Sequence, residues 1–474
     1  MTPNTSRRDF LASFGGGLGG IAVASLLSQD GLLADMPSPR PDFNGGLHHP
    51  AKVRRVIQLF MNGGASQCDL FDFKPKLVER HGQPFDPGTT EPGTVFSGAA
   101  MKSPFEWGRH GQSGRWVSSA LPHIAKHVDE LAFLMAMVSK SNVHGPAAYL
   151  QNTGFLPPGF PCMGAWISYG LGSLRDNLPA FVVLPDARGL PYNGSSAFSS
   201  GFLPPNHQGT VVNANVATPI THLQPPGWAK HITPESRADG LQLLRKLNEA
   251  HASERPGDAS LLARIASYES AAKLQVAAPE ILNLASESES TKHSYGLDDA
   301  ATAPFGRNCL LARRMIERGV RFVQVWSGQG GAAGNWDNHF DIPKELGFIA
   351  RASDQPTAAL LQDLKERGLL EDTLLIWTTE FGRTPFAQAA SGRDHNGRTF
   401  VSWMAGAGVQ RGVAHGQSDE WSWKAAENPT TCYDFHATIL HLLGIDHTKL
   451  TFYHNGIQRR LTDVHGRVVR EILT

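Results

Sequence analysis

The sequence predicts an α/β protein with a doubly wound, mostly parallel sheet that carries helices on both faces. Short apolar runs alternate with helical patterns, which favours strand–helix–strand crossovers. These apolar runs are nearly continuous, as is typical of parallel strands buried on both faces of a sheet. The six expected strands span residues 56–61, 131–138, 180–184, 320–326, 373–378 and 400–405.

Periodic apolar residues predict helices between and after the later strands. Gly319 and Gly368 stand where two of these helices are expected to stop, because glycine readily adopts the left-handed conformation found after a helix. The expected helices span residues 305–318, 353–367 and 433–443, with a further charged, helix-like stretch over 234–284.

The mature chain is expected to form a single domain over residues 50–474, with an irregular insertion over about 185–300. Residues 185–226 are rich in Pro, Gly, Asn and Ser, so we expect them to cover one end of the sheet without regular structure. Residues 287–299 are expected to form a mobile loop.

Composition excludes two classes of protein. The 474 residues include 43 Lys and Arg and 43 Asp and Glu, and a formal charge of zero excludes a general binder of nucleic acid, which needs a surplus of cations. The 41% of apolar residues and the 10 Trp exclude a disordered tail protein. The four Cys lie far apart and form no C-x-x-C pair, so we expect free, buried thiols.

The first residues have the pattern of an export signal. Arg7 and Arg8 precede a weakly apolar stretch over residues 12–27 that five glycines dilute. That stretch is too short to span a bilayer, which takes about 20 apolar residues. The pattern predicts a twin-arginine signal over residues 1–34, no transmembrane span in the mature chain, and a location in the periplasm or cell envelope, with an uncleaved signal as a tether.

Dense polar segments follow most of the expected strands. In open α/β sheets, ligands bind outside the carboxyl ends of the strands, so we expect these segments to converge on one site at that edge. They span residues 62–69, 139–145, 335–339 and 379–383, with 393–396 a little later.

Two carboxylates and two imidazoles in these segments predict a site for a divalent cation. Mixed oxygen and nitrogen ligands suit Zn, Mn or Ca. A single Asp-Asn-His run, as at residues 337–339, more often forms a hydrogen-bonded turn than a metal site. Its position after a predicted strand favours a role in binding a metal. The predicted ligands are Asp337, His339, Glu380 and His395, with His415 in reserve.

Other residues near the strand ends are candidates for holding an anion. Arg383 and Arg393 would bind a sulfate or phosphate through paired N–H groups, although structural ion pairing explains them equally well. Gly63 and Gly64 would let backbone N–H groups approach an oxyanion. No P-loop or dinucleotide-binding motif follows the first strand, so ATP and NAD are disfavoured.

Three aromatic residues near the C-terminus offer two interpretations. Trp421, Trp423 and Tyr453 would form a platform for stacking a sugar if they were exposed. Tryptophans at this spacing more often belong to the core.

Several segments are more specific than these patterns. They are FMNGGASQCDLFDFKP (60–75), HGPAAYLQNTG (144–154), NWDNHFD (335–341), TTEFGRTP (378–385), GRDHN (392–396) and a C-terminal segment (434–466) that contains DFHATILHLLGIDHTKLT and GIQRRLTDVHG. The chain resembles an uncharacterised family of twin-arginine-exported bacterial proteins that is assigned to the alkaline phosphatase/sulfatase superfamily. The resemblance extends over about residues 53–473 and implies an alkaline phosphatase-like fold.

The resemblance also implies roles for individual residues. His144 begins the segment that resembles the nucleophile helix of sulfatases, which implies a nucleophile or general acid/base, and Ser141 stands in reserve three residues earlier. The NWDNH and TTEFG segments resemble metal-binding segments of alkaline phosphatases, and His395 resembles their last metal-binding histidine.

The sequence departs from the superfamily pattern at three ligand positions, at one of which Glu380 replaces Asp. Asn62 stands where an Asp ligand follows the first strand, with Asp69 further along in reserve. Phe381 stands where a second ligand is usual, and a phenyl ring cannot bind a metal. We therefore expect one ion rather than two.

The strand-end polar segments and the export signal, together with what the resemblance implies, predict an exported, metal-dependent hydrolase of a sulfate or phosphate ester, either on a small molecule or on a polysaccharide. His144 would be the nucleophile or acid/base, and Arg383 the anion clamp. The alternative is a non-catalytic sulfatase-like protein that binds a glycan or a protein partner at the cell envelope. A third interpretation is a structural protein of the envelope.

Overall fold

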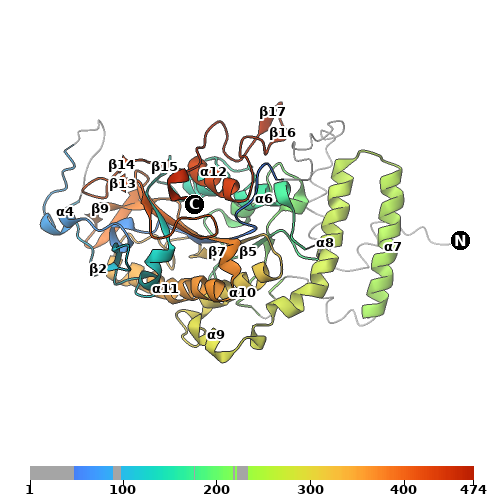
Figure 1. Ribbon diagram of the computed structural model, residues 1–474, viewed down its shortest axis with the longest axis horizontal. Coiled ribbons are helices and arrows are strands. Elements are labelled where there is room, and N and C mark those ends of the chain that lie inside the picture. The colour runs from blue at the N-terminus through green and yellow to red at the C-terminus, as the bar shows by residue number, and fades with distance from the viewer. Residues whose placement is uncertain (1–46, 89–97, 176, 217–218, 221–232) are drawn as a thin grey trace.

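The structure, a computed structural model, describes residues 47–88, 98–175, 177–216, 219–220 and 233–474 (Figure 1). The predicted signal over residues 1–34 lies outside the described residues. Of the helices in the described ranges, none is both long and apolar enough to cross a membrane.

A nine-stranded sheet forms the centre of the molecule and contains all six expected strands. Of the strands described in it, β11 alone runs antiparallel to its neighbours, β4 and β8, so the predicted doubly wound, mostly parallel sheet is confirmed. In order across the sheet the strands are β12 (Ala414–His415), β4 (Ala132–Val138), β11 (Phe400–Gly406), β8 (Thr373–Thr378), β1 (Arg55–Met61), β7 (Phe322–Ser327), β5 (Phe181–Leu184) and β6 (Thr210–Val211), and β15 (Thr430–Thr431) also pairs with β4.

The register of the sheet brings the carboxyl ends of four strands to one edge. Leu59 of β1 lies opposite Val325 of β7 and Trp377 of β8, so these three parallel strands end level with one another. β4 runs parallel to β8, because β11 between them is antiparallel to both. The segments that follow β1, β4, β7 and β8 therefore leave the sheet at the same edge.

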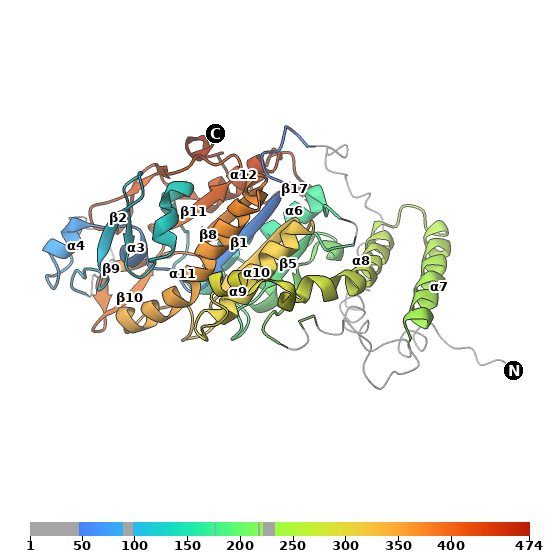
Figure 2. The ribbon, with the colours of Figure 1, turned by 60° about the horizontal axis from the view of Figure 1, so that its bottom comes forward.

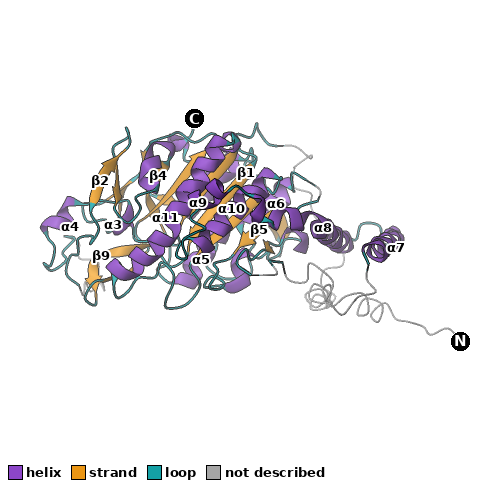
Figure 3. Ribbon diagram, turned by 90° about the horizontal axis from the view of Figure 1, so that it is seen from below, coloured by secondary structure: helices purple, strands orange, loops and turns teal. Residues whose placement is uncertain are grey.

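Helices cover both faces of the sheet (Figures 1 and 3). Ile57 and Leu59 of β1 pack into the core beneath one layer and Val56 and Phe60 into the core beneath the other, because successive side chains of a strand point to opposite faces. The first layer contains α10 (Ala303–Glu317) and α11 (Ile342–Glu366), and the second contains α6 (Met163–Leu171) and α12 (Cys432–Leu442), with α5 (His144–Thr153) beside α12.

The predicted helix ends and the helix-like stretch agree with the structure. Gly319 follows α10 with φ 102° and Gly368 follows α11 with φ 68°, both in the left-handed region that glycine favours. The stretch over 234–284 forms α7 (Pro234–Ser253) and α8 (Ala259–Leu282), which project from the body as a pair (Figure 1).

The expectation of a mobile loop over residues 287–299 was wrong. The segment contains α9 (Glu289–Ser294) and is fixed to the helical layer beside it. Glu287 forms an ion pair of 2.6 Å with Arg313 of α10, and Tyr295 is fully buried. These partners come from distant parts of the sequence, so local composition did not reveal them.

Short elements complete the described chain, and the four cysteines are free and buried, as expected. Four antiparallel hairpins pair β2 with β3, β9 with β10, β13 with β14 and β16 with β17. These elements are α3 (Gln67–Leu70), α4 (Pro75–Glu79), β2 (Trp107–His110), β3 (Arg115–Ser118), β9 (Gly382–Gln388), β10 (Gly392–Asn396), β13 (Gln417–Ser418), β14 (Ala425–Glu427), β16 (Phe452–His454) and β17 (Ile457–Arg459).

Candidate metal centre

Four segments at the carboxyl edge of the sheet bring the site residues together. His144 is the first residue of α5, after β4, and Asp337 and His339 follow β7. Glu380 comes directly after β8. His395 lies on β10, in the hairpin that leads to β11. The expected convergence of strand ends is present.

Three imidazoles surround one carboxylate oxygen. Nε2 of His144 lies 3.1 Å from Oδ1 of Asp337. Nε2 of His339 lies 2.7 Å from the same oxygen, and Nε2 of His395 lies 3.1 Å from it. One ligand atom from each of the four residues lies within 4.8 Å of all the others. Three ring nitrogens and one carboxylate oxygen form a ligand set that suits zinc.

In each of the three rings, the nitrogen that points away from Asp337, Nδ1, contacts an acceptor oxygen. Such an oxygen can only accept a hydrogen bond, so Nδ1 of each ring carries the hydrogen and Nε2 is left to face Asp337. The acceptors are Oε1 of Glu380 for His144 (2.7 Å), the carbonyl oxygen of Asn142 for His395 (2.7 Å) and Oε1 of Gln388 for His339.

The cluster needs a positive charge at its centre. Nε2 of His339 lies only 2.9 Å from Nε2 of His395, although both face the same carboxylate. Two ring lone pairs at this distance repel one another unless a proton or a cation lies between them. Because the partners of Nδ1 select the tautomer in which Nε2 is a ligand, a divalent cation fits these residues.

The local charges shift the pKa values of all four residues. In the metal-free cluster, where a proton on Nε2 can take the place of the cation, burial raises the pKa of Asp337, but hydrogen bonds from the three protonated rings and the charge of Arg383 lower it far more, so this carboxylate is ionised. The hydrogen bond to Asp337 raises the pKa of His339. Burial lowers the pKa of His395; for His144, burial acts in the same direction, but hydrogen bonds to Asp337 and Glu380 raise its pKa overall.

Glu380, a predicted ligand, lies behind His144 rather than in the four-residue cluster. Its Oε1 accepts a hydrogen bond from Nδ1 of His144 and another from the backbone N–H of Gly63 (2.8 Å). The side chain is fully buried. Glu380 is thus placed to orient His144, and His144, the predicted nucleophile, takes the place of a ligand.

Arg383 is fully buried, and its donors are engaged within the chain. Nε donates to the carbonyl of Gly64 (2.8 Å), and Nη1 donates to that of Arg393 (3.2 Å). Nη2 donates to Oδ1 of Asp337 (2.6 Å) and to the carbonyl of Gly63. The expected role as an anion clamp does not fit this geometry, because the guanidinium holds Asp337 and the loop after β1 instead.

Gly63 and Gly64 allow the loop after β1 to pack closely against the site. Both have positive φ angles, 120° and 76°. A Cβ atom on Gly63 would lie 2.6 Å from the backbone nitrogen of Asp337, and one on Gly64 would lie 2.6 Å from the ring of Phe381. Since the N–H of Gly63 is bonded to Glu380, the pair does not present the oxyanion nest that we expected.

Phe381 forms an apolar wall on one side of the cluster. It is fully buried, and its ring centroid lies 4.8 Å from those of His144 and His395. The phenyl ring fills this side of the cluster without offering a ligand atom. Within the described ranges, one group of potential ligands is found.

Tyr192 is a residue of the site that sequence reasoning missed. Its ring stacks on His144 with centroids 4.3 Å apart and planes 5° from parallel. Its hydroxyl donates to Oδ2 of Asp337 (3.1 Å) and accepts from Nδ2 of Asn335 (3.2 Å). The available signal was that its loop also follows the carboxyl end of a strand, β5.

Two of the reserve residues support the site from behind. Asn62 is buried at the end of β1, and its Nδ2 donates to the carbonyls of Gly328 and Gln329. Asp69 pairs with Arg393 through two hydrogen bonds of 2.7 and 3.0 Å, and both side chains are buried. Asp69 therefore fixes the hairpin that carries His395.

The other two reserve residues do not belong to the cluster. Ser141 accepts a hydrogen bond from the backbone of Val143 (3.1 Å) in the turn before α5. His415 is buried on β12, beside Leu134 of β4, at the edge of the sheet.

Trp421 and Trp423 are buried, so they do not form a platform for stacking a sugar. They are 5% and 7% exposed and pack with Phe85 in a small core cluster. The interpretation as core residues is confirmed.

Comparisons with known proteins give a family and several distant structural neighbours. A family model described as "Protein of unknown function (DUF1501)" matches residues 53–473, and no curated protein matches the sequence. Among solved structures, the chain is similar to the lipoteichoic acid synthase LtaP from Listeria monocytogenes (10% identity, 88% of this chain and 77% of that chain, TM-score 0.39), the PsFucS1 sulfatase from Pseudoalteromonas sp. (14%, 86% and 74%, 0.34) and the alkaline phosphatase from the Antarctic bacterium TAB5 (11%, 83% and 98%, 0.35).

Proposed function

We propose that this chain, which belongs to the DUF1501 family, is a hydrolase of sulfate or phosphate esters that works with one divalent cation. The observation that supports this is the convergence of three Nε2 atoms on one ionised carboxylate, with each Nδ1 held by an oxygen. The proposed ligands are His144, Asp337, His339 and His395.

A cation bound there would supply the charge that polarises the ester and stabilises the negative charge of the transition state. The chain's own residues shape the site for it. Glu380 holds the ring of His144, Arg383 holds Oδ1 of Asp337, and Tyr192 holds Oδ2. Phe381 excludes water from one side.

We propose water as the attacking group. His144 is turned toward Asp337, and the hydroxyl of Ser141 is engaged in the turn before α5. Water would add its OH to the sulfur or phosphorus atom and its remaining hydrogen to the leaving oxygen, which releases an alcohol and an inorganic anion.

We also propose that the protein is exported by the twin-arginine route to the periplasm or cell envelope. The support is the Arg7-Arg8 pair ahead of a short apolar stretch that glycines dilute.

A non-catalytic protein that binds a glycan or a protein partner is the second candidate. Two observations favour it: Phe381 fills the place of a second ligand, and Arg383 has its donors engaged within the chain. This candidate keeps the metal but not the hydrolysis.

Metal analysis of the purified protein tests the proposal. We expect about one equivalent of metal, with His144→Gln and His339→Gln losing it and His415→Gln, away from the cluster, keeping it. Hydrolysis of aryl sulfates or aryl phosphates should disappear on chelation and return when metal is added.

The outcomes separate the two candidates. Stoichiometric metal without hydrolysis of any ester in the panel would favour the non-catalytic protein. Absence of metal, together with equal thermal stability before and after chelation, would contradict both.

A further inference from the structure

A row of half-buried aromatic rings lies near the hairpin of β9 and β10, apart from the metal cluster. Phe73 packs between Trp107 and Trp116, with ring centroids 5.5 and 4.4 Å from its own. Trp107 is on β2 and Trp116 on β3, and the pairing of Arg109 with Trp116 puts both indoles on one face of this hairpin. We call Phe73, Trp107 and Trp116 the aromatic ridge; β2, α3 and β9 lie at the same end of the molecule (Figure 2).

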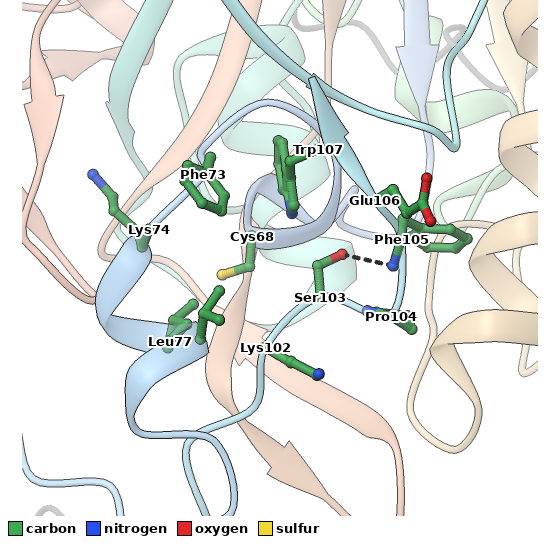
Figure 4. Close-up of a pocket in the computed structure, with 11 residues that line it drawn as sticks. Cys68, Phe73, Lys74, Leu77, Lys102, Ser103, Pro104, Phe105, Glu106 and Trp107 are labelled. Atoms are coloured by element: carbon green, nitrogen blue, oxygen red, sulfur yellow. Dashed lines mark hydrogen bonds between the residues drawn. The ribbon is translucent and has the colours of Figure 1, made fainter. Parts of the chain in front are cut away.

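The ridge has a hollow on each side. The larger hollow, of about 270 Å³, lies beside Phe73 and Trp107, with the buried side chains of Cys68 and Leu77 at its floor (Figure 4). The smaller one, of about 100 Å³, is lined by Phe73, Trp116 and Arg115. Each is below the roughly 300 Å³ at which pockets for whole small molecules begin, so each suits one ring of a larger ligand.

The charges around the ridge favour an anion. Arg115 is half-buried, its Nε has no hydrogen-bond partner, and no described carboxylate forms an ion pair with it. In the described part of the chain Lys102 and Arg109 also have no acidic partner. Two carboxylates line the hollows, Asp72, which is paired with Lys74 at 3.1 Å, and the exposed Glu106, so the cations around the ridge outnumber the carboxylates. Because the Nε–H of Arg115 is buried without an acceptor, an anionic group from a ligand would stabilise Arg115.

We propose that the aromatic ridge binds an anionic glycan, with a sugar ring in each hollow and a sulfate or phosphate group on Arg115. Sugar rings present C–H faces that pack on aromatic rings, and the guanidinium of Arg115 supplies charge-assisted hydrogen bonds. A neutral apolar ligand would leave Arg115 unpaired, so the observations favour a charged sugar over a neutral lipid.

The ridge is also tied to the metal-bearing hairpin. Phe73 follows α3, which comes directly after the glycine loop of β1. Nη2 of Arg393, two residues before His395, donates to the carbonyl of Met101 (3.0 Å) in the segment that leads to Trp107. In naming this glycan as part of the substrate, the inference rests on the proposed function, but the binding itself does not need the metal.

Titration of a labelled, sulfated glucan hexasaccharide and of its unsulfated parent tests the inference. At one fixed ionic strength we expect the sulfated probe to bind at least about tenfold more tightly, and Arg115→Gln to remove most of this difference. Trp107→Ala should weaken both probes about threefold to tenfold, with Trp107→Phe as a milder variant if the alanine variant does not fold. Arg255→Gln, which removes an exposed charge next to α7, is the matched control and should bind as the unchanged protein does.

Two results would overturn the inference: equal affinity for the two probes, or an Arg115→Gln variant that binds as well as Arg255→Gln. The titration is run on metal-free and metal-loaded protein. Ridge-dependent binding in a protein without metal or hydrolysis would support the glycan site and contradict the hydrolase, whereas metal and hydrolysis without ridge-dependent binding would do the reverse.

Discussion

At the scale of single residues, one oxygen atom organises the candidate metal centre. Oδ1 of Asp337 faces three histidine nitrogens and accepts a hydrogen bond from Arg383, and Oδ2 accepts one from Tyr192. The two oxygens therefore have separate tasks. Each of the three imidazole rings is oriented by an acceptor oxygen that contacts its Nδ1, and this contact keeps the hydrogen of the ring on Nδ1.

Replacing Glu380 with Gln should weaken metal binding about tenfold to a hundredfold without unfolding the protein. The amide can donate to Nδ1 of His144, which would move the ring hydrogen to Nε2 and remove a ligand lone pair. The measurement is the dissociation constant for zinc by competition with a chelator. Glu366→Gln, on α11, is the control, and equal affinities of the two variants would contradict the role of Glu380.

At the scale of elements, the hairpin of β9 and β10 carries His395 and Arg383 and is anchored by a buried ion pair. Asp69 of α3 binds Arg393 of β10 through two hydrogen bonds, and neither side chain is exposed. The hairpin also contacts the segment that leads to the aromatic ridge. Its position is thus set by α3 and by that segment, not by its own two strands.

Asp69→Asn should destabilise the protein by about 3–5 kcal/mol, because it leaves the charge of Arg393 buried without its partner. Glu249→Gln breaks an exposed pair with Arg245 and should cost less than about 1 kcal/mol. The free energy of unfolding of each variant can be measured with denaturant. Similar values for the two would show that the buried pair does not anchor the hairpin.

At the scale of the whole molecule, buried neutral histidines link stability to pH. Burial lowers the pKa of His436 to about 4, and its Nε2 donates to the carbonyl of Gln151 (2.9 Å). Burial also lowers the pKa of His207 to about 4, where Nδ1 lies 2.9 Å from the hydroxyl of Ser168. His436 lies on α12 and His207 contacts Ser168 of α6, and both helices cover the sheet. We therefore expect protonation of either ring to lower the stability of the whole fold.

The contribution of these two histidines to the free energy of unfolding should be fully present above the unfolded histidine pKa of 6.5. It should fall as the pH decreases from 6.5 to about 4. In that window the unfolded chain binds protons that the folded chain does not, at a cost of roughly 3 kcal/mol for each ring. Unfolding measured across this range should show a shallower slope for His436→Gln. The exposed His81→Gln variant should keep the original slope, and equal slopes for both would contradict the assignment.

The sequence by itself determined the strands of the sheet and the edge that carries the site. Three of the four residues that form the cluster were also among the predicted ligands. Apolar runs such as residues 373–378 and the polar segments after them are local features, and the parallel topology converts strand ends into a shared edge. The central strands therefore agreed closely with the structure. Asp337, His339 and His395 followed from that edge and from the resemblance.

The tertiary structure decided which side chains face which. His144 and Glu380 are 236 residues apart, and their contact is what places one in the cluster and the other behind it. The sequence shows only that Tyr192 lies in a loop after a strand, and it gives no signal for Arg115, because stacking on a ring or lacking a counter-ion depends on neighbours brought by other segments. The positions of the strands along the chain are set by the local hydrophobic pattern, whereas the order of the strands, the ligands, the positioning residues and the binding surface are set by long-range packing.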